Sequence, residues 1–165
     1  MKFVKLAIIS IVFFFLLVTG MSLFIPSTAR VSRALQVNAT ASRLKDQVAD
    51  PLHWKNWYPG ADTLDILYVE GKPAGIITGP MQGVIITDQT DSSVIAGRAG
   101  AGSKEMEMGW NFLAEDSNRT TVQWYMEFKL RWYPWEKFAS LLFEKQYGTQ
   151  MEQGLNRLKK TLENN

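Results

Sequence analysis

The sequence predicts an α+β domain, in which a curved antiparallel sheet of about six to seven strands packs around one long C-terminal helix, preceded by an N-terminal transmembrane helix. Three observations indicate this arrangement. There is an uncharged apolar run at residues 6–25, a series of short alternating segments over residues 64–132, and helical spacing over residues 135–162. A sheet wrapped around one helix buries the apolar faces of the last two regions together.

The N-terminal run begins at Leu6, ends at Ile25 and contains no charge. As a helix it is about 30 Å long, which matches the hydrocarbon core of a bilayer. A cleaved signal peptide is the competing interpretation, because Lys2 and Lys5 precede the run and Thr19-Gly20 offers small residues for cleavage. The apolar run resumes after that weak site, which favours an uncleaved anchor. A buried soluble helix is a third alternative, although the middle of the run is apolar on every face.

The charges that flank the run bear on its orientation. Lys2, Lys5 and the α-amino group favour a cytoplasmic N-terminus, whereas Arg30 and Arg33 follow the run closely enough to weaken that bias. We therefore expect a single-pass protein of the cell membrane. Residues 1–25 would be the anchor, and residues 26–165 would form one domain outside the cytoplasm, since no repeat or low-complexity segment divides them.

The first part of the domain predicts one strand and two short helices. Residues 29–37 alternate loosely, which is typical of a strand. Asn38 and Thr40 are both suitable N-caps for a helix that ends at residue 49. Asp50-Pro51 then supplies an N-cap and a proline at the first helical position, for a brief helix that carries two tryptophans.

From residue 64 onward, short apolar segments are separated by turn residues, which is typical of an antiparallel meander. The first four segments are residues 64–69, 74–78, 84–87 and 94–96, and a glycine-rich stretch, 97–102, follows as a predicted loop. Residues 104–112 and 121–132 are the clearest strands, because their even positions are apolar. These positions hold Met106, Met108, Trp110 and Phe112 in one strand, and Val122, Trp124, Met126, Phe128, Leu130 and Trp132 in the other. Each strand therefore has one buried and one solvated face.

Residues 135–162 change to helical spacing and predict one long helix. Its apolar stripe comprises Phe138, Leu141, Met151, Leu155, Leu158 and Leu162. Lys159 and Lys160 lie in its final turns, where cations suit the helix dipole.

Particular residues add a family resemblance to this architecture. The segment HWKNWYP at residues 53–59 contains a Trp-x-x-Trp pattern, and it is accompanied by GIITGPMQGVIITDQTDSSVI at residues 75–95 and EQGLNRLK at residues 152–159. With these segments, the chain resembles the SRPBCC superfamily, which includes START-like lipid-binding and polyketide cyclase-like domains. An apolar anchor followed by Pro26-Ser27-Thr28 looks like a membrane-tethered bacterial subgroup. The resemblance implies a helix-grip fold, with a hydrophobic cavity between the concave face of the sheet and the long helix.

Candidates for lining that cavity lie on the inward faces of the predicted elements. Aromatic and methionine side chains suit varied apolar ligands, because they supply contact area and adaptable shape. Gly148 is a candidate because a missing side chain leaves room for a ligand, although a local kink is equally consistent with it. The candidates are Trp54, Trp57, Met106, Met108, Trp110, Trp124, Met126, Phe128, Trp132 and Gly148. The aromatic and methionine residues among them can instead make a packed core.

Several other chemistries are excluded or disfavoured. Without cysteine the chain has no disulfide, thiolate zinc site or cysteine nucleophile, and its single histidine rules out metal sites that need two imidazoles. Residues 97–104 approach a P-loop, but Ser103-Lys104 reverses the required order. His53 is the one possible imidazole base, and no nucleophile motif accompanies it. We therefore expect no catalytic residue, no metal and no cofactor.

Charged residues offer weaker alternatives. Glu105 and Glu107 share a strand face and could act as a carboxylate pair, although solvation explains that polar face equally well. Arg98, at the mouth of the implied cavity, is a candidate for holding a lipid or acid headgroup.

The formal net charge of +2 does not indicate a nucleic-acid partner. Lys2 and Lys5 account for the whole excess, so residues 26–165 hold equal numbers of basic and acidic residues and lack a basic footprint. The expected function is a membrane-anchored domain that binds a small hydrophobic or amphipathic ligand, such as a lipid or a polyketide-like compound. A cyclase-like or hydrolytic enzyme and a protein-interaction module remain as alternatives, and oligomeric state is left open.

Overall fold

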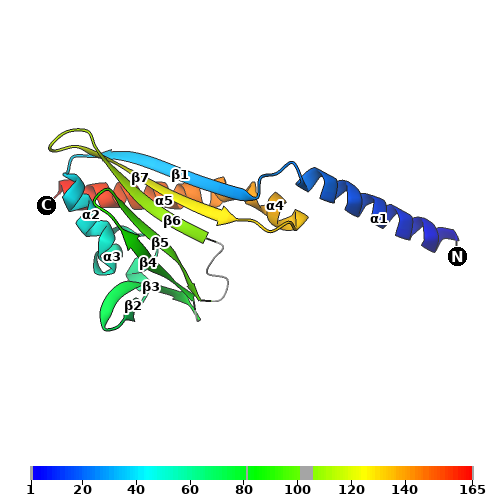
Figure 1. Cartoon of the computed structure of the whole chain (residues 1–165), viewed down its shortest axis with the longest axis horizontal. Helices are drawn as coiled ribbons and strands as arrows, with labels where there is room; N and C mark the ends of the chain where they lie inside the picture. Colours follow the sequence, from blue (N-terminus) through cyan, green and yellow to red (C-terminus); the bar gives the residue numbers. More distant parts are fainter. Residues whose placement is uncertain (1, 81, 101–105, 165) are drawn as a thin grey trace.

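The computed structural model describes residues 2–80, 82–100 and 106–164. Within them, seven antiparallel strands form one sheet packed with helices, and a separate N-terminal helix extends away from the domain (Figure 1). The helices are α1 (Lys2–Ser22), α2 (Ala41–Ala49), α3 (Trp54–Trp57), α4 (Pro134–Ser140) and α5 (Phe143–Glu163), with short 3-10 turns at Pro51–His53 and Ala61–Thr63. The strands are β1 (Thr28–Val37), β2 (Ile66–Val69), β3 (Lys72–Gly79), β4 (Gln82–Gln89), β5 (Ser93–Gly100), β6 (Met106–Ala114) and β7 (Thr120–Lys129).

The sheet order is β1-β7-β6-β5-β4-β3-β2, so β2 to β7 pair in sequence and β1 lies against the last strand. The pairing of β1 with β7 runs without a shift from Thr28 opposite Lys129 to Val37 opposite Thr120. Helix α5 lies along β1 (Figure 1), and it contacts β7 through Phe143, whose ring packs on that of Phe128. The α+β class, with a long C-terminal helix packed on an antiparallel sheet, is therefore confirmed.

The face of the sheet that packs against α5, here called the inner face, carries the even-numbered residues of β6 and β7. Across these strands Trp110 lies opposite Trp124, Met108 opposite Met126, and Met106 opposite Phe128. Helix α5 covers them with a buried stripe comprising Met151, Leu155, Leu158 and Leu162. The predicted alternation is confirmed because a pleated strand turns successive side chains to opposite faces.

Side chains from the following segments cap the last four carbonyls of α2, which have no partner within the helix. The pairs are Trp54 Nε1 to Val48 O at 2.7 Å, Trp57 Nε1 to Gln47 O at 3.1 Å, His53 Nδ1 to Asp46 O at 3.1 Å, and Gln89 Nε2 to Ala49 O at 3.4 Å. Because a carbonyl can only accept, His53 contributes a protonated Nδ1 to this cap. The Trp-x-x-Trp pattern and His53 thus share a structural role at the end of α2.

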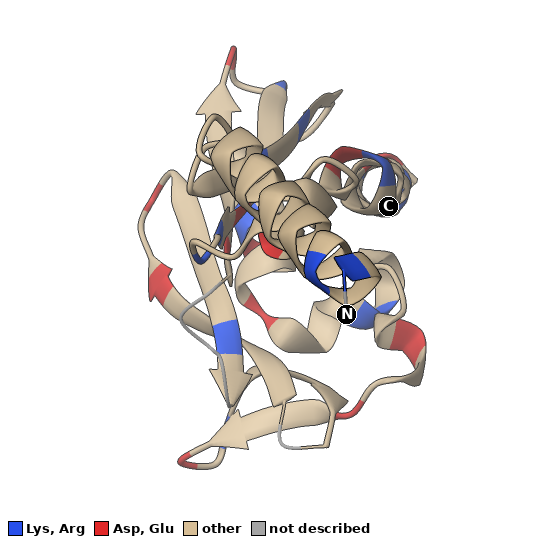
Figure 2. Ribbon diagram, turned by 90° about the vertical axis from the view of Figure 1, so that its right-hand side faces the viewer, with Lys and Arg blue, Asp and Glu red and all other residues tan. Residues whose placement is uncertain are grey.

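Helix α1 is long and apolar enough to cross a membrane, and its side chains are exposed over most of its length. Figure 2, a view of the end of the molecule from which α1 projects, shows basic residues only near the N-terminus of this helix. The opposite end is held to the domain, since Lys137 Nζ of α4 donates to the carbonyl oxygen of Ile25 at 2.9 Å. The segment just after α1 is therefore hydrogen-bonded to α4 of the domain.

Of the predicted boundaries that are wrong, those of the last strand and the last helix matter most for the candidate residues. The strand expected over residues 121–132 ends at Lys129, because its partner β1 begins at Thr28 and the last bond between them joins Leu130 N to Ser27 O at 2.8 Å. The helix expected over residues 135–162 is divided into α4 and α5 near Leu141, and the separate α4 packs against the end of α1, where Lys137 donates to the carbonyl oxygen of Ile25.

The prediction that the glycine-rich stretch 97–102 is a loop is also partly wrong. Residues 97–100 belong to β5, where they pair with β4, while residues 101–105 lie outside the described residues. Arg98 is consequently a strand residue, and Glu105 falls outside the described part of the chain.

Candidate functional site

Four of the candidate tryptophans form one aromatic cluster with Tyr58, between α3 and the inner face. The closest ring centroids, those of Trp54 and Tyr58, are 5.2 Å apart, and Trp110 stacks on Trp124 at 5.5 Å. Trp57 completes the cluster with edge-to-face contacts to Trp110 and Trp124. All four indoles are buried. These tryptophans therefore pack as core at this end of the space between sheet and helices.

The four indoles differ in hydrogen bonding. Those of Trp54 and Trp57 cap α2, whereas the Nε1 atoms of Trp110 and Trp124 are buried with no hydrogen-bond partner among the described residues. A buried donor without a partner forfeits its interaction with water and gains nothing in return.

We expect the substitution Trp54→Phe to lower the free energy of unfolding by about 1 kcal/mol more than Trp110→Phe. Both substitutions remove similar buried ring area, but only the first leaves the Val48 carbonyl without its donor. Urea unfolding of the detergent-solubilised full chain, followed by tryptophan fluorescence, measures the difference. Equal losses would contradict a capping role for Trp54.

A pocket of about 320 Å³, here called the α4–α5 pocket, opens between the ends of β5, β6 and β7 and the two C-terminal helices. Its lining residues are Arg98, Met106, Phe128, Lys129, Leu130, Glu136, Ala139, Phe143 and Tyr147. The Phe128 ring lies 4.5 Å from that of Phe143 and 4.9 Å from that of Tyr147, measured between centroids. The pocket is thus apolar on two walls, and Met106 and Phe128 of the sequence candidates line it.

Arg98 brings a charge to the inner face at the edge of this pocket. It lies opposite Val84 of β4, and Val94 and Ala96, on the same face of β5, are buried. Its guanidinium donates to the side-chain oxygen of Gln82, which carries no charge. An exposed arginine on the apolar face of a sheet, beside an open pocket, is placed to meet an anionic group on a ligand.

The carboxylate in the pocket lining, that of Glu136, is already engaged. Glu136 accepts a hydrogen bond from the backbone N–H of Arg131 at 2.9 Å, and its Oε1 lies 3.7 Å from Nε of the same residue. The charge of Glu136 is therefore balanced by Arg131 and does not compete for Arg98.

Met108 and Met126 lie between the pocket residues Met106 and Phe128 and the aromatic cluster that contains Tyr58. The hydroxyl of Tyr58 donates to the sulfur of Met108 at 3.9 Å, a weak interaction. Burial, with a smaller contribution from Tyr147, raises the pKa of Tyr58 well above its ordinary value. The Tyr58 hydroxyl consequently stays protonated and remains a donor.

Gly148, the candidate on α5, does not leave open space. A Cβ there would overlap the guanidinium of Arg33, which reaches across the helix from β1 and bonds Glu144 and Glu152 at 2.6 Å each. These two carboxylates raise the pKa of Arg33. The expectation that Gly148 gives room to a ligand is wrong, because Arg33 occupies that room.

The effect of Gly148→Ala on stability should change sign when Arg33 is removed. Gly148→Ala is expected to destabilise the wild-type chain by about 1 kcal/mol or more, since it displaces the guanidinium. In an Arg33→Ala background the same change should stabilise by up to about 1 kcal/mol, because alanine favours helix. The four unfolding free energies of this cycle test the assignment, and an unchanged sign would rule it out.

Trp132 is also placed differently from the prediction. Since β7 ends at Lys129, the alternation that would turn Trp132 inward does not reach it, and its side chain is 66% exposed. It packs on Tyr133, with ring centroids 4.9 Å apart. Trp132 therefore lies on the surface and not in a cavity.

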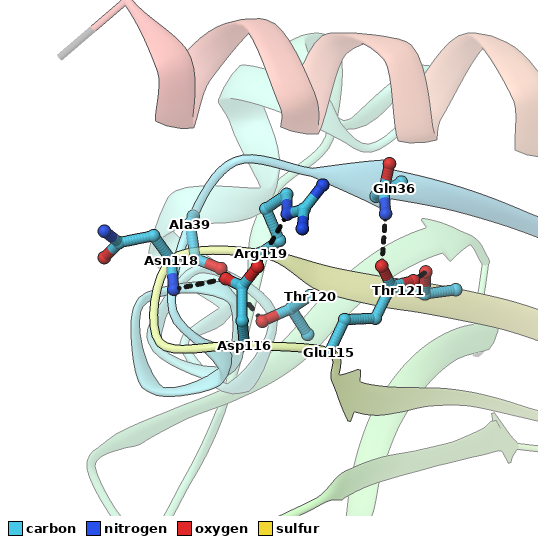
Figure 3. A network of polar contacts seen from close by, with 8 residues as sticks. All are labelled: Gln36, Ala39, Glu115, Asp116, Asn118, Arg119, Thr120 and Thr121. Carbon is cyan, nitrogen blue, oxygen red and sulfur yellow. Dashed lines mark hydrogen bonds and ion pairs between the residues drawn. The ribbon is translucent and has the colours of Figure 1, made fainter.

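A second, more open hollow lies at the opposite end of the sheet, beside the turn between β6 and β7. Polar contacts hold this turn together (Figure 3): Arg119 pairs with Asp116 at 2.7 Å, and Thr120 donates to the carbonyl oxygen of Ala39 at 2.9 Å. The backbone N–H of Asn118, followed by Arg119, lowers the pKa of Asp116. These contacts are made within the turn and to Ala39, which precedes α2, so the network stabilises the hairpin and joins it to the start of α2.

Sequence reasoning missed the helical wall of the α4–α5 pocket, which Ala139, Phe143 and Tyr147 provide. The spacing of Phe143 and Tyr147, one helical turn apart, places them on one face and could have indicated this wall. Among the described residues, no group of three His, Asp or Glu side chains is arranged to hold a metal ion.

Residues 28–163 match the family described as polyketide cyclase / dehydrase and lipid transport, and the chain belongs to this family. No curated protein matches the sequence.

Solved structures show the same fold. The aromatase/cyclase ZhuI from Streptomyces sp. R1128 is 18% identical, with a TM-score of 0.61 over 82% of this chain and 94% of its own. A START superfamily protein from Mycobacterium smegmatis is 16% identical, with a TM-score of 0.60 over 82% and 98%. A solution structure from Thermobifida fusca is 15% identical, with a TM-score of 0.60 over 81% and 92%. The SRPBCC, START-like resemblance and the helix-grip fold are thereby confirmed.

Proposed function

We propose that the protein is a membrane-anchored domain that binds a small amphipathic molecule, a lipid or a polyketide-like compound, in the α4–α5 pocket without chemical conversion. The observation that carries this proposal is the combination of two apolar walls with Arg98 on the inner face at the pocket's edge. Membership of a family that includes lipid transport supports the same ligand class.

The pocket limits the size of the ligand. Its volume of about 320 Å³ lies at the lower end of the range of roughly 300–1,000 Å³ for small-molecule sites. One acyl chain or a compact ring system suits this space better than a whole two-chain lipid. Rings at Phe128, Phe143 and Tyr147 offer flat contact area for such an apolar part.

We propose that the polar end of the ligand, which would lie at Arg98, is acidic. Arg98 presents a planar set of donors, which recognise a carboxylate or phosphate in two-point fashion. Its present partner, the neutral amide of Gln82, can be exchanged for an anion without leaving a buried charge unpaired.

Helix α1 supports the anchored state. It has 21 residues, exposed apolar side chains and no acidic residue. A bilayer would therefore bury the apolar side chains that the domain leaves exposed. We place residues 26–165 outside the cytoplasm because of Lys2 and Lys5. As the chain has no cysteine, a Ser117→Cys variant can be labelled with a membrane-impermeant maleimide, and labelling only after cell lysis would refute this orientation.

Ligand binding can be tested with a pocket-filling variant. The full chain is purified in mild detergent, incubated with a lipid extract and examined by native mass spectrometry. We expect a retained small-molecule adduct in the wild type and its loss in Ala139→Trp, where the indole enters the α4–α5 pocket.

Ala114→Trp is the matched control, since Ala114 is exposed at the far end of β6. It should retain the adduct. Absence of any adduct from the wild type would refute binding, and equal retention in both variants would refute the location.

A further inference from the structure

The segment that joins β7 to α5 carries an exposed apolar patch, here called the α4 patch, made of Trp132, Trp135, Leu141 and Leu142. Their side chains are 66%, 62%, 65% and 65% exposed. The chain's other four tryptophans are all buried. So much exposed apolar area in one short segment is unusual for a surface that faces water alone.

The patch lies where α1 joins the domain. Lys137, only 6% exposed, lies within α4 and donates to the carbonyl oxygen of Ile25, while Leu23 and Phe24 just before it are exposed. Figure 1 shows α4 at the base of α1, on the side of the domain from which α1 projects. A bilayer spanned by α1 must therefore begin within a few residues of α4.

The side chains of the patch suit the boundary of a bilayer. Tryptophan is enriched at the level of the lipid headgroups, because its ring is apolar and its N–H is polar. Trp135 stacks on Tyr133 at 4.7 Å with an angle of 11° between the rings, and Trp132 packs on the same tyrosine. This gives a preformed aromatic group in the same segment as the two exposed leucines.

The patch also adjoins the α4–α5 pocket. Ala139, which lines the pocket, lies one helical turn after Trp135 on α4, and Phe143, another lining residue, directly follows Leu142. None of the four patch residues lines the pocket itself.

We propose that the α4 patch lies in the headgroup region of the bilayer that α1 spans, and that ligand passes between this bilayer and the α4–α5 pocket without crossing water. This inference rests on the proposed function, because it needs both the anchor and the pocket. It adds that the ligand comes from the bilayer, and that the α4 side of the domain faces the membrane.

Measuring the depth of labels in the bilayer tests the position of the α4 patch independently of the position of the anchor. Single nitroxide labels are placed at Phe14, Trp135 and Leu113 through cysteine substitutions of the full chain, reconstituted in nanodiscs of phosphatidylcholine and phosphatidylglycerol. Accessibility to oxygen, which concentrates in lipid, is compared with accessibility to a water-soluble nickel complex. Leu113 is the control, an exposed apolar residue at the far end of β6.

We expect lipid-like accessibility at position 14, an interfacial value at position 135 and an aqueous value at position 113. An aqueous value at 135 with a lipid-like value at 14 would overturn the docking while leaving the anchor intact. An aqueous value at 14 would refute the anchor itself. A label at 135 shielded from both reagents would show that protein covers the patch, which also overturns the proposal.

Transfer kinetics test the route of the ligand. The Trp132→Ser/Trp135→Ser variant should slow the transfer of a dansylated fatty acid from the surrounding bilayer to the pocket by about ten-fold, with occupancy at equilibrium unchanged. Tyr68→Ser/Leu113→Ser, which changes exposed apolar residues elsewhere, is the control and should transfer at the wild-type rate. Equal rates in both variants would exclude the α4 patch from the route.

Discussion

Replacing Arg98 by glutamine is expected to weaken the binding of an acidic amphipathic ligand by about 10- to 100-fold, which corresponds to about 1.5–3 kcal/mol for a hydrogen bond to a charged group. The arginine lies on the inner face opposite Val84, at the edge of the α4–α5 pocket. Glutamine keeps a donor and much of the length but removes the charge and the two-point geometry.

The test compares a dansylated fatty acid with its uncharged amide, each titrated by fluorescence against the full chain in nanodiscs. The amide should bind the wild type and Arg98→Gln within about two-fold of each other, since only the carboxylate needs the charge. Arg43→Gln, at the other end of the sheet beside the β6–β7 turn, controls for the loss of a positive charge. A similar loss for both ligands, or for both variants, would be incompatible with a headgroup contact at Arg98.

The largest effect on stability is expected at Gly75. A Cβ there would overlap the carbonyl oxygen of Val84 and lie 2.8 Å from the carbonyl carbon and 2.9 Å from Cα of Ile85, all backbone atoms of β4. Because backbone cannot move aside as a side chain can, Gly75→Ala should separate β3 from β4 and cost about 3 kcal/mol or more.

Gly79→Ala is the matched control in the same strand. A Cβ at Gly79 meets no atom within 4 Å, so its effect should stay within about 0.5 kcal/mol. Urea unfolding in detergent, followed by tryptophan fluorescence, compares the two, and failure of Gly75→Ala to accumulate as folded protein agrees with the prediction. Similar stability of both variants would mean that β3 and β4 do not approach each other closely at Gly75.

Sequence reasoning was most successful where the signal is local. The alternation in β6 and β7 follows from the two-residue period of a strand, and the stripe Met151, Leu155, Leu158, Leu162 follows from the helical period. The apolar run of α1 is likewise a property of neighbouring residues. Such patterns can be recognised without knowing which elements pack against each other, which is why element order and fold class could be predicted.

The same local patterns failed where an element ends because of something distant in sequence. Trp132 continues the alternation of β7, yet the strand stops at Lys129 because β1 begins at Thr28. Gly148 shows no local sign of its neighbour, since Arg33 arrives from a strand more than 100 residues away.

By itself, the sequence determined an apolar helix long enough for a bilayer, the order of strands and helices, and a neutral domain with apolar inward faces. The tertiary structure alone decided which of those faces are filled and which stay open. Side chains from α3, β6 and β7 close one end with four tryptophans, whereas the α4–α5 pocket stays open at the other end, near the residues that follow α1. The physical reason is that periodicity fixes the direction of a side chain along its own element, while a cavity depends on how several elements pack against each other.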